Sequence, residues 1–130
     1  ALREVSPNTG FTRAERDEHL RRTGYMASRL AAHGVTVVAS FVSPYRESRD
    51  FVRRLCPGFV EIYVSTPLEE CERRDVKGLY ARARRGEIRN FTGIDDPYEV
   101  PEHPELSLDT RALSVEQSVN QVLALFEDQR

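Results

Sequence analysis

The chain has no tryptophan, one methionine, two cysteines and one lysine among its 130 residues. The cysteines, Cys56 and Cys71, lie far apart, without a C-x-x-C spacing or a nearby residue at metal-ligand spacing. This pattern favours two small buried thiols over a disulfide or a metal site. The sequence also has no apolar run long enough to span a membrane, and its first residues have no signal-peptide core. A cytoplasmic location without membrane attachment is therefore the expected setting.

An excess of charge of one sign is also missing. The formal net charge is −2, with 39% hydrophobic and 31% charged residues, which is typical of a soluble globular protein. A chain of this length has room for one domain with a single core. Because there is no basic excess, nucleic acid is not the expected partner. The eighteen arginines are more simply explained by base composition than by chemistry, which makes the single Lys77 the unusual cation.

The hydrophobic pattern alternates between helical and extended periods. Thr12 and Glu15 form a capping-box pair that predicts a helix start, and Gly34 stands where that helix would end. The apolar run from Val35 to Ser43 predicts a strand buried on both faces. The expected order is a helix over 12–33, a strand over 35–43, a helix from 43–44 up to Pro57, a strand over 59–65, a short helix over 66–73, an irregular segment over 86–104, a strand over 105–110 and a helix starting at Ser114.

This alternation predicts an α/β fold with a parallel sheet and flanking crossover helices. Ligands of such sheets bind at the carboxyl ends of the strands, and Ser43 follows the first of them. The helix that begins at Pro44 would offer free N–H groups to an anion, although Ser43 fits the role of a plain helix N-cap equally well. The irregular segment over 86–104 contains glycines and aromatic residues, which favours a functional lid over a disordered linker.

The arginines divide into two groups. Three pairs lie on predicted helices and are expected to be mostly solvated: 21–22, 53–54 and 84–85. Arg3 and Arg16 differ, because they flank Phe11 near the entry to a helix. Two guanidinium groups beside an aromatic ring suit a planar base that carries phosphate or sulfate, since the forks bind the oxyanion and the ring stacks on the base.

Four segments resemble the adenylyl-sulfate kinases. The sequence "GFTRAERDEHLRR" is similar to their Gly-Phe-Ser-x-x-Asp-Arg-x-x-Asn-x-Arg-Arg segment, and "SFVSPYRESRD" to their Ser-Phe-Ile-Ser-Pro-Tyr-Arg segment. The other two are "PLEECERRDVKGLY" and the longer stretch "KGLYARARRGEIRNFTGIDDPYEVPEHPELSLDT". The likeness covers nearly the whole chain, and four segments in the same order are far more specific than one short motif.

The resemblance implies a P-loop kinase fold and roles for individual residues. These enzymes transfer the γ-phosphate of ATP to the 3′-hydroxyl of adenosine 5′-phosphosulfate (adenylyl sulfate) in sulfate activation. Arg3 and Arg16 would hold the phosphosulfate end of this substrate. Phe11 and Phe91 would stack on the two faces of its adenine.

The resemblance also implies roles around Ser43 and in the expected lid. Val42 and Ser43 would line the nucleotide, and Ser43 is sometimes described in the family as a phosphoserine intermediate, although direct in-line transfer needs no covalent step. Lys77 would reach a phosphate or the substrate, so Ser43 and Lys77 are the catalytic candidates. Tyr80 would lie on the ATP side. The lid would cover about 76–104 and exclude water from the transferred group.

Three positions depart from the family pattern. His19 and Asn90, both expected at the substrate site, stand where the family usually has Asn and Gly, and Thr9 replaces a Leu. Family members also begin with a strand and a G-x-x-x-x-G-K-[ST] loop that holds the phosphates of ATP and Mg²⁺, and no such motif occurs in this sequence. No residue of the chain is therefore predicted as a metal ligand.

The interpretation is that residues 1–130 form one adenylyl-sulfate kinase-like domain that lacks the N-terminal strand, the P-loop and the first helix. The favoured explanation is a piece of a full kinase, which uses ATP and Mg²⁺. The alternative is a non-catalytic regulatory domain such as that of fungal ATP sulfurylases, and a third is a partner chain that supplies the loop. A different small-molecule or nucleoside kinase of the same fold also stays open. A homodimer, and fusion to or association with ATP sulfurylase, are the expected assemblies.

Overall fold

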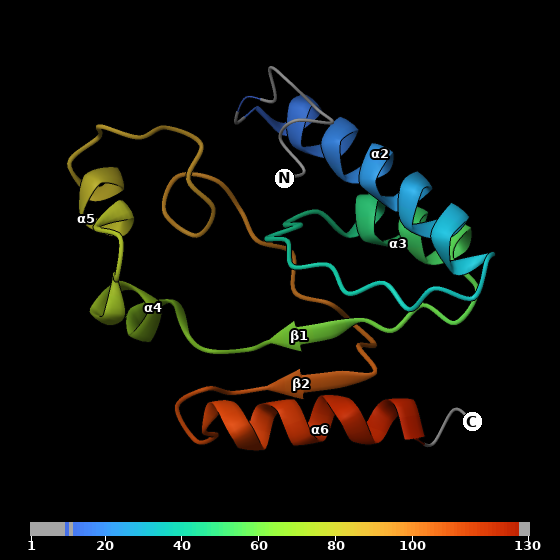
Figure 1. Ribbon diagram of the computed structural model, residues 1–130. Coiled ribbons are helices and arrows are strands. Elements are labelled where there is room, and N and C mark those ends of the chain that lie inside the picture. The colour runs from blue at the N-terminus through green and yellow to red at the C-terminus, as the bar shows by residue number, and fades with distance from the viewer. Residues whose placement is uncertain (1–9, 11, 128–130) are drawn as a thin grey trace. The chain divides into compact units, whose positions relative to one another are not determined.

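The computed structural model describes Gly10 and residues 12–127, and its described part divides into two compact units. Among the described residues, unit 1 comprises 10, 12–59 and 82–100, and unit 2 comprises 60–81 and 101–127. Each unit is built from segments that are distant in the sequence (Figure 1).

Unit 1 is organised by two helices that lie side by side, α2 (Arg13–Ala31) and α3 (Arg46–Leu55) (Figure 1). The predicted capping box at the start of α2 is confirmed, because the Thr12 side chain accepts from the Glu15 backbone N–H and the Glu15 carboxylate accepts from the Thr12 N–H. Gly34 follows the helix with φ of +77°, as expected of a glycine that ends a helix.

The contact between α2 and α3 depends on a glycine. Gly24 is the buried residue of α2, and a Cβ atom there would lie 2.7 Å from Cγ2 of Val52, which is itself buried on α3. The Arg21 guanidinium also lies over the Phe51 ring, 4.3 Å from its centroid. The core of unit 1 accordingly follows α3, where Tyr45, Ser48 and Val52 are 2%, 2% and 9% exposed.

Unit 2 contains a parallel pair of strands, β1 (Ile62–Val64) and β2 (Leu106–Leu108), in the register Ile62 to Leu106 and Val64 to Leu108. The helix α4 (Leu68–Arg74) follows β1, and α6 (Val115–Glu127) follows β2. The short helix α5 (Leu79–Arg84) begins in unit 2 and ends in unit 1. The predicted α/β class with parallel strands is confirmed, and so is the capping pair of Ser114 and Gln117 before α6.

The predicted strand over 35–43 is wrong for the described structure. The segment has no regular secondary structure, and it forms no ladder with another strand among residues 12–127. Its valines are correspondingly exposed, with Val38 at 85% and Val42 at 64%. A strand needs a second strand that takes up its backbone N–H and C=O groups, and no described strand pairs with this segment.

Smaller corrections concern the apolar faces and the cysteines. Apolar side chains of α6 stay exposed, with Val115 at 82% and Leu123 at 53%. Cys56 and Cys71 are free, as expected, but only half-buried. Burial raises the pKa of the Cys56 thiol, whose Sγ donates to the Gly24 carbonyl at 3.7 Å.

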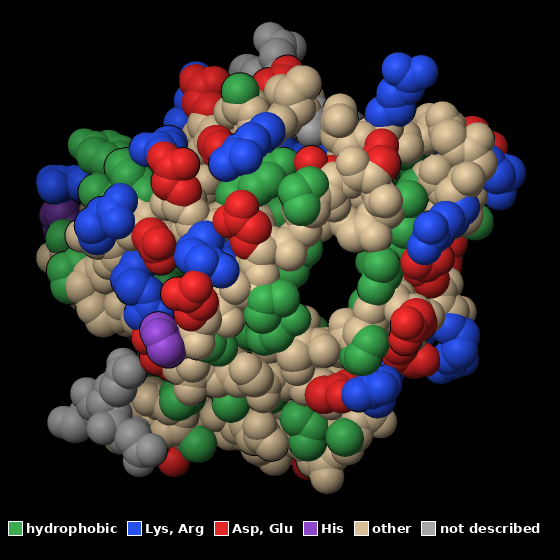
Figure 2. Space-filling model, turned by 180° about the vertical axis from the view of Figure 1, so that it is seen from behind, with side chains coloured by type: hydrophobic (Ala, Val, Ile, Leu, Met, Phe, Trp, Pro, Cys, Tyr) green, Lys and Arg blue, Asp and Glu red, His purple; other side chains and the backbone are tan. Residues whose placement is uncertain are grey.

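Arginine side chains are mixed with acidic ones on the face seen in Figure 2, where blue and red groups lie beside one another. Among the described residues, ion pairs of this kind join Arg74 to Glu70 and Arg111 to Asp109, each at 2.6 Å. Two arginine contacts pull the pKa of Glu70 down to about 2, the hydrogen bond from Arg73 being the larger cause. Within the part of the chain that is described, no helix has the length and apolar character needed to cross a bilayer.

Candidate nucleotide site

A tight turn over 90–96 presents Phe91 in unit 1. The Asp95 carboxylate accepts the backbone N–H groups of Asn90 and Phe91, at 2.9 and 2.6 Å, which closes the turn from one side. The Phe91 carbonyl accepts from Ile94 at 3.0 Å and also from the next two backbone N–H groups. Asn90 takes a left-handed conformation with φ of +56°, which Asn tolerates better than most residues.

Arg16 of α2 reaches this turn with its guanidinium. Its Nη1 donates to Thr92 Oγ1 at 2.8 Å and to Asp96 Oδ2 at 3.1 Å, and its Nη2 donates to the Asn90 carbonyl. The side chains of Arg16 and Asp96 are each 18% exposed, so this ion pair is only partly screened by water. The structure thus brings together Arg16, Asn90 and the turn of Phe91, three residues predicted from the sequence.

Tyr45 joins the same cluster from the start of α3. Its hydroxyl donates to Asp96 Oδ2 at 2.7 Å, and the Arg13 guanidinium lies over its ring, 4.3 Å from the centroid. Burial, and next the bond to the Asp96 carboxylate, raise the pKa of Tyr45, so its hydroxyl remains a donor at physiological pH. Sequence reasoning missed both Tyr45 and Asp96, although the segments "SPYR" and "DDPYE" that contain them were noted.

Ser43 lies just before this cluster, in a strained conformation. Its φ is +35°, a region that non-glycine residues seldom occupy. The N-cap of α3 is Tyr45, so the predicted N-cap role of Ser43 is wrong. Instead, the Ser43 carbonyl accepts from Nη1 of Arg49 at 2.7 Å. Arg49 is 7% exposed and also donates from Nη2 to the Glu99 carbonyl at 2.6 Å, so one arginine holds the Ser43 backbone against the segment that follows the turn.

The remaining predicted residues of unit 1 lie beside this region or outside the described chain. The His19 ring lies 5.6 Å from the Phe41 ring, between centroids, and its buried Nδ1 has no hydrogen-bond partner in the described structure. Val42 precedes Ser43 and is exposed. Arg3 and Phe11 lie outside the described residues, so the expected stacking of Phe11 and Phe91 on one base stays a prediction.

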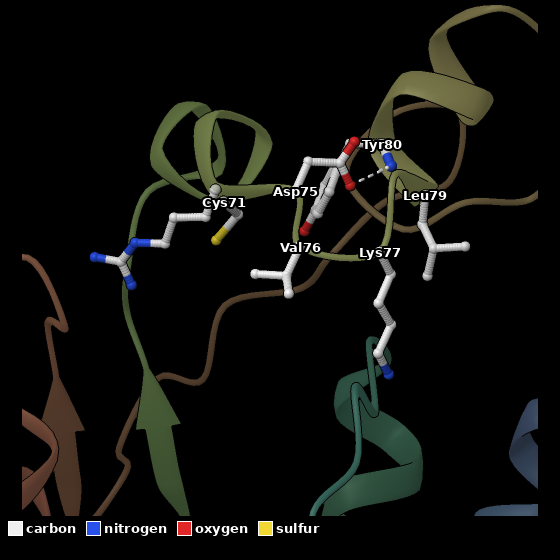
Figure 3. Close-up of a pocket in the computed structure, with 7 residues that line it drawn as sticks. Cys71, Asp75, Val76, Lys77, Leu79 and Tyr80 are labelled. Atoms are coloured by element: carbon white, nitrogen blue, oxygen red, sulfur yellow. Dashed lines mark hydrogen bonds between the residues drawn. The ribbon is translucent and has the colours of Figure 1, made fainter.

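Lys77 and Tyr80 belong to unit 2, where they line a pocket of about 260 Å³. Its other lining residues are Cys71, Arg74, Asp75, Val76 and Leu79. In Figure 3 the dashed line joins the Asp75 carboxylate to the backbone N–H of Tyr80, a bond of 3.0 Å, while the Lys77 side chain points away from that carboxylate. Asp75 also accepts from the Ala81 N–H at 2.9 Å, and these backbone bonds, the Ala81 one foremost, lower its pKa.

The pocket therefore rests on a capped turn. Asp75 accepts backbone N–H groups of the first turn of α5. Gly78, which lies between Asp75 and α5, has a φ of +65°. Burial raises the pKa of Tyr80, with the neighbouring Cys71 as the next cause. The expected lid over about 76–104 has residues in both units and stays a prediction.

A magnesium site does not fit the described part of the chain. Across Gly10 and residues 12–127, no three His, Cys, Asp or Glu side chains gather in an arrangement that could hold a metal ion. Both carboxylates of the turn over 90–96 already have partners: Asp95 accepts from backbone N–H groups, and Asp96 accepts from Arg16 and Tyr45.

Comparison with known proteins agrees with these features. A family model described as "Adenylylsulphate kinase" matches residues 2–109. An adenylyl-sulfate kinase of Picosynechococcus is 54% identical over 119 residues, which cover 92% of this chain and 67% of that protein. The solved structure of the Mycobacterium tuberculosis APS kinase in complex with AMPPNP and APS is 42% identical, with a TM-score of 0.91, and the match covers 97% of this chain and 75% of that one.

A hexameric APS kinase from Thiobacillus denitrificans is 31% identical, with a TM-score of 0.70 over 98% of this chain and 21% of that one. The fold is accordingly that of an α/β kinase of the P-loop class. The chain belongs to the adenylyl-sulfate kinase family, which confirms the resemblance read from the four segments. It spans about two thirds of the length of the curated relatives that it matches.

Proposed function

We propose that this chain supplies the adenylyl-sulfate site of a kinase that transfers the γ-phosphate of ATP to the 3′-hydroxyl of adenylyl sulfate. The observation that carries the proposal is the contact of the Arg16 guanidinium with the turn of Phe91, through Asn90 and Thr92. A guanidinium and an aromatic residue are the two groups that an anionic nucleotide needs, one for the charge and one for the base. The relative from M. tuberculosis, solved with APS and AMPPNP, has the same fold at 42% identity.

In this proposal Arg16 binds the phosphosulfate group and Phe91 stacks on the adenine. Arg3 and Phe11 complete the grip on the anion and the base, with Val42, Ser43, His19 and Asn90 around them. Lys77 contacts a phosphate, and Tyr80 lies on the ATP side. ATP with Mg²⁺ is the phosphoryl donor of the whole kinase.

Calorimetric titration with adenylyl sulfate tests the proposal, with AMP, which lacks the sulfate, as the matched ligand. We expect adenylyl sulfate to bind at least tenfold more tightly than AMP. We expect Arg16→Met to remove most of this difference, because a charge-assisted hydrogen bond contributes about 1.5–3 kcal/mol. Arg29→Met, on the exposed C-terminal part of the same helix, is the control and should leave both affinities unchanged.

Equal affinity of the unmodified chain for the two ligands would contradict the proposal. A coupled assay of ADP release, run beside the titration, separates a catalytic chain from a binding module of the kind found in fungal ATP sulfurylases. We expect binding without turnover from the 130 residues alone, because the sequence contains no G-x-x-x-x-G-K-[ST] motif to hold ATP.

We further propose that the chain associates with a second copy through the exposed segment over 35–42. The support is its run of exposed valines, which have no strand partner among the described residues and therefore favour pairing with another chain. The expected cytoplasmic location and the association with ATP sulfurylase stay predictions.

A further inference from the structure

The Asp96 carboxylate links a buried tyrosine to the arginine of the proposed anion site. One oxygen, Oδ2, accepts both from Tyr45 Oη at 2.7 Å and from Arg16 Nη1 at 3.1 Å. The three residues come from the start of α3, the turn over 90–96 and α2, which are far apart in the sequence. All three lie within unit 1, so the cluster belongs to one compact body.

The position of this oxygen is fixed from the protein interior. Tyr45 is 2% exposed, and its ring lies under the Arg13 guanidinium at 4.3 Å. Its hydroxyl therefore has little freedom, and the carboxylate that it contacts is held in place. Because the Asp96 carboxylate is already held in place, its ion pair with Arg16 costs less side-chain entropy than a salt bridge near the surface usually does.

The contacts of Arg16 leave one side of its guanidinium available. A guanidinium has five N–H groups. Nη1 uses its two on Thr92 and Asp96, and Nη2 uses one on the Asn90 carbonyl. None of the described residues accepts a hydrogen bond from Nε or from the second Nη2 hydrogen of Arg16. Two N–H groups are what a bidentate contact with a sulfate or phosphate oxygen pair requires.

We propose that Tyr45 and Asp96 are positioning residues that hold Arg16 against the turn of Phe91 and aim its remaining N–H groups at the anion of the bound nucleotide. This inference rests on the proposed adenylyl-sulfate site and adds two residues to it. Neither residue touches the substrate, and each acts through Arg16. The opposite role for Asp96 is a competitor that occupies Arg16 until the anion displaces it, and the two roles predict opposite effects of removing the carboxylate charge.

Two conservative variants separate these roles. Tyr45→Phe removes the hydroxyl and keeps the buried ring, and Asp96→Asn removes the charge and keeps the shape. We expect each to weaken the affinity for adenylyl sulfate about twofold to tenfold, because one hydrogen bond to a positioning carboxylate is lost. The double variant should be no weaker than Asp96→Asn alone, because both residues act through one contact. The affinity for AMP should change less than that for adenylyl sulfate, since the anion grip is what Arg16 supplies.

The controls are Tyr25→Phe, at an exposed tyrosine of α2, and Asp109→Asn, in unit 2. Hydrogen exchange of the amides over 90–96 gives a second measurement, and we expect faster exchange in both test variants, with unchanged helix content by circular dichroism. Unchanged or tighter binding of adenylyl sulfate by Asp96→Asn would overturn the inference, whatever the exchange shows. If the unmodified chain binds adenylyl sulfate and AMP equally well, the proposed function itself fails. If the unmodified chain prefers adenylyl sulfate and the variants bind it equally tightly, only the positioning role fails.

Discussion

In the turn over 90–96, the Asp95 side chain caps backbone N–H groups. It accepts the N–H groups of Asn90 and Phe91, and the bond from Phe91 is the main cause that lowers its pKa. The charged form is therefore the one that the folded turn prefers. Its contribution to the stability of the turn is fully present above the ordinary aspartate pKa of about 4 and is lost as the pH falls through the lower pKa of the folded state.

A variant at this position should show that pH dependence. We expect Asp95→Asn to exchange its Asn90 and Phe91 amide hydrogens faster than the unmodified chain at about pH 6. The difference should shrink as the pH falls through the lowered pKa of the native carboxylate, which is then neutral as well. Hydrogen exchange of the two chains at matched pH values measures this, with Asp50→Asn on exposed α3 surface as the control. Equal exchange rates at pH 6 would show that the carboxylate does not hold the turn.

At this scale the sequence could predict which residues belong together but not how they are joined. Arg16, Asn90 and Phe91 were expected at one site, and the structure places Arg16 on the turn of the other two. The bonds of Tyr45 to Asp96 and of Arg49 to the Glu99 carbonyl join residues that are 51 and 50 positions apart. Long-range side-chain bonds of this kind have no local periodicity from which to read them.

Among the elements, the pair α2 and α3 determines the position of Arg16 relative to Tyr45. Their close approach depends on Gly24, since a Cβ there would lie 2.7 Å from Cγ2 of Val52 and 3.2 Å from its Cγ1. Val52 is branched at Cβ and buried, so it cannot simply turn away.

The substitution Gly24→Ala therefore sets two effects against each other. Alanine favours the helix by about 1 kcal/mol, but overpacking at a buried contact costs about 1–3 kcal/mol. We expect a net loss of stability in Gly24→Ala, and we expect the double variant with Val52→Ala to be more stable than Val52→Ala alone, because the added methyl then fills the space that was opened. Urea unfolding followed by circular dichroism gives both differences. A rise in stability for Gly24→Ala in the native background would show that the helices do not pack through this residue.

Secondary structure was predicted well where its signals are local. The capping box of α2, the cap of α6 and the glycine after α2 are all present, because each depends on residues a few positions apart. The two strands of unit 2 also lie inside their predicted ranges, at Ile62–Val64 and Leu106–Leu108. The segment over 35–43 has the composition of a strand but no partner among the described residues, and pairing cannot be read from one segment alone.

At the scale of the whole molecule, the described structure leaves an apolar segment exposed to solvent. Val35, Val37 and Val38 are 47%, 38% and 85% exposed in one segment. The proposed association with a second copy would cover them. We expect sedimentation analysis to show mass increasing with protein concentration, and Val38→Lys to shift the chain toward monomer, because a charge on an exposed edge opposes strand pairing.

The control for this test is Val76→Lys, at a valine that is 92% exposed but lies in the turn between α4 and α5. It should leave the association unchanged. A chain that stays monomeric at all concentrations, with and without Val38→Lys, would contradict the proposed dimer.

The place where adenylyl sulfate binds is the central claim, and amide chemical shifts measured by NMR during titration test it most directly. We predict that the ligand changes the shifts of Arg16 and of the turn over 90–96 at low concentration, with little change along α6. Ligand-induced changes confined to α6 and the strands of unit 2, or none at a ligand concentration that saturates binding by calorimetry, would contradict the account.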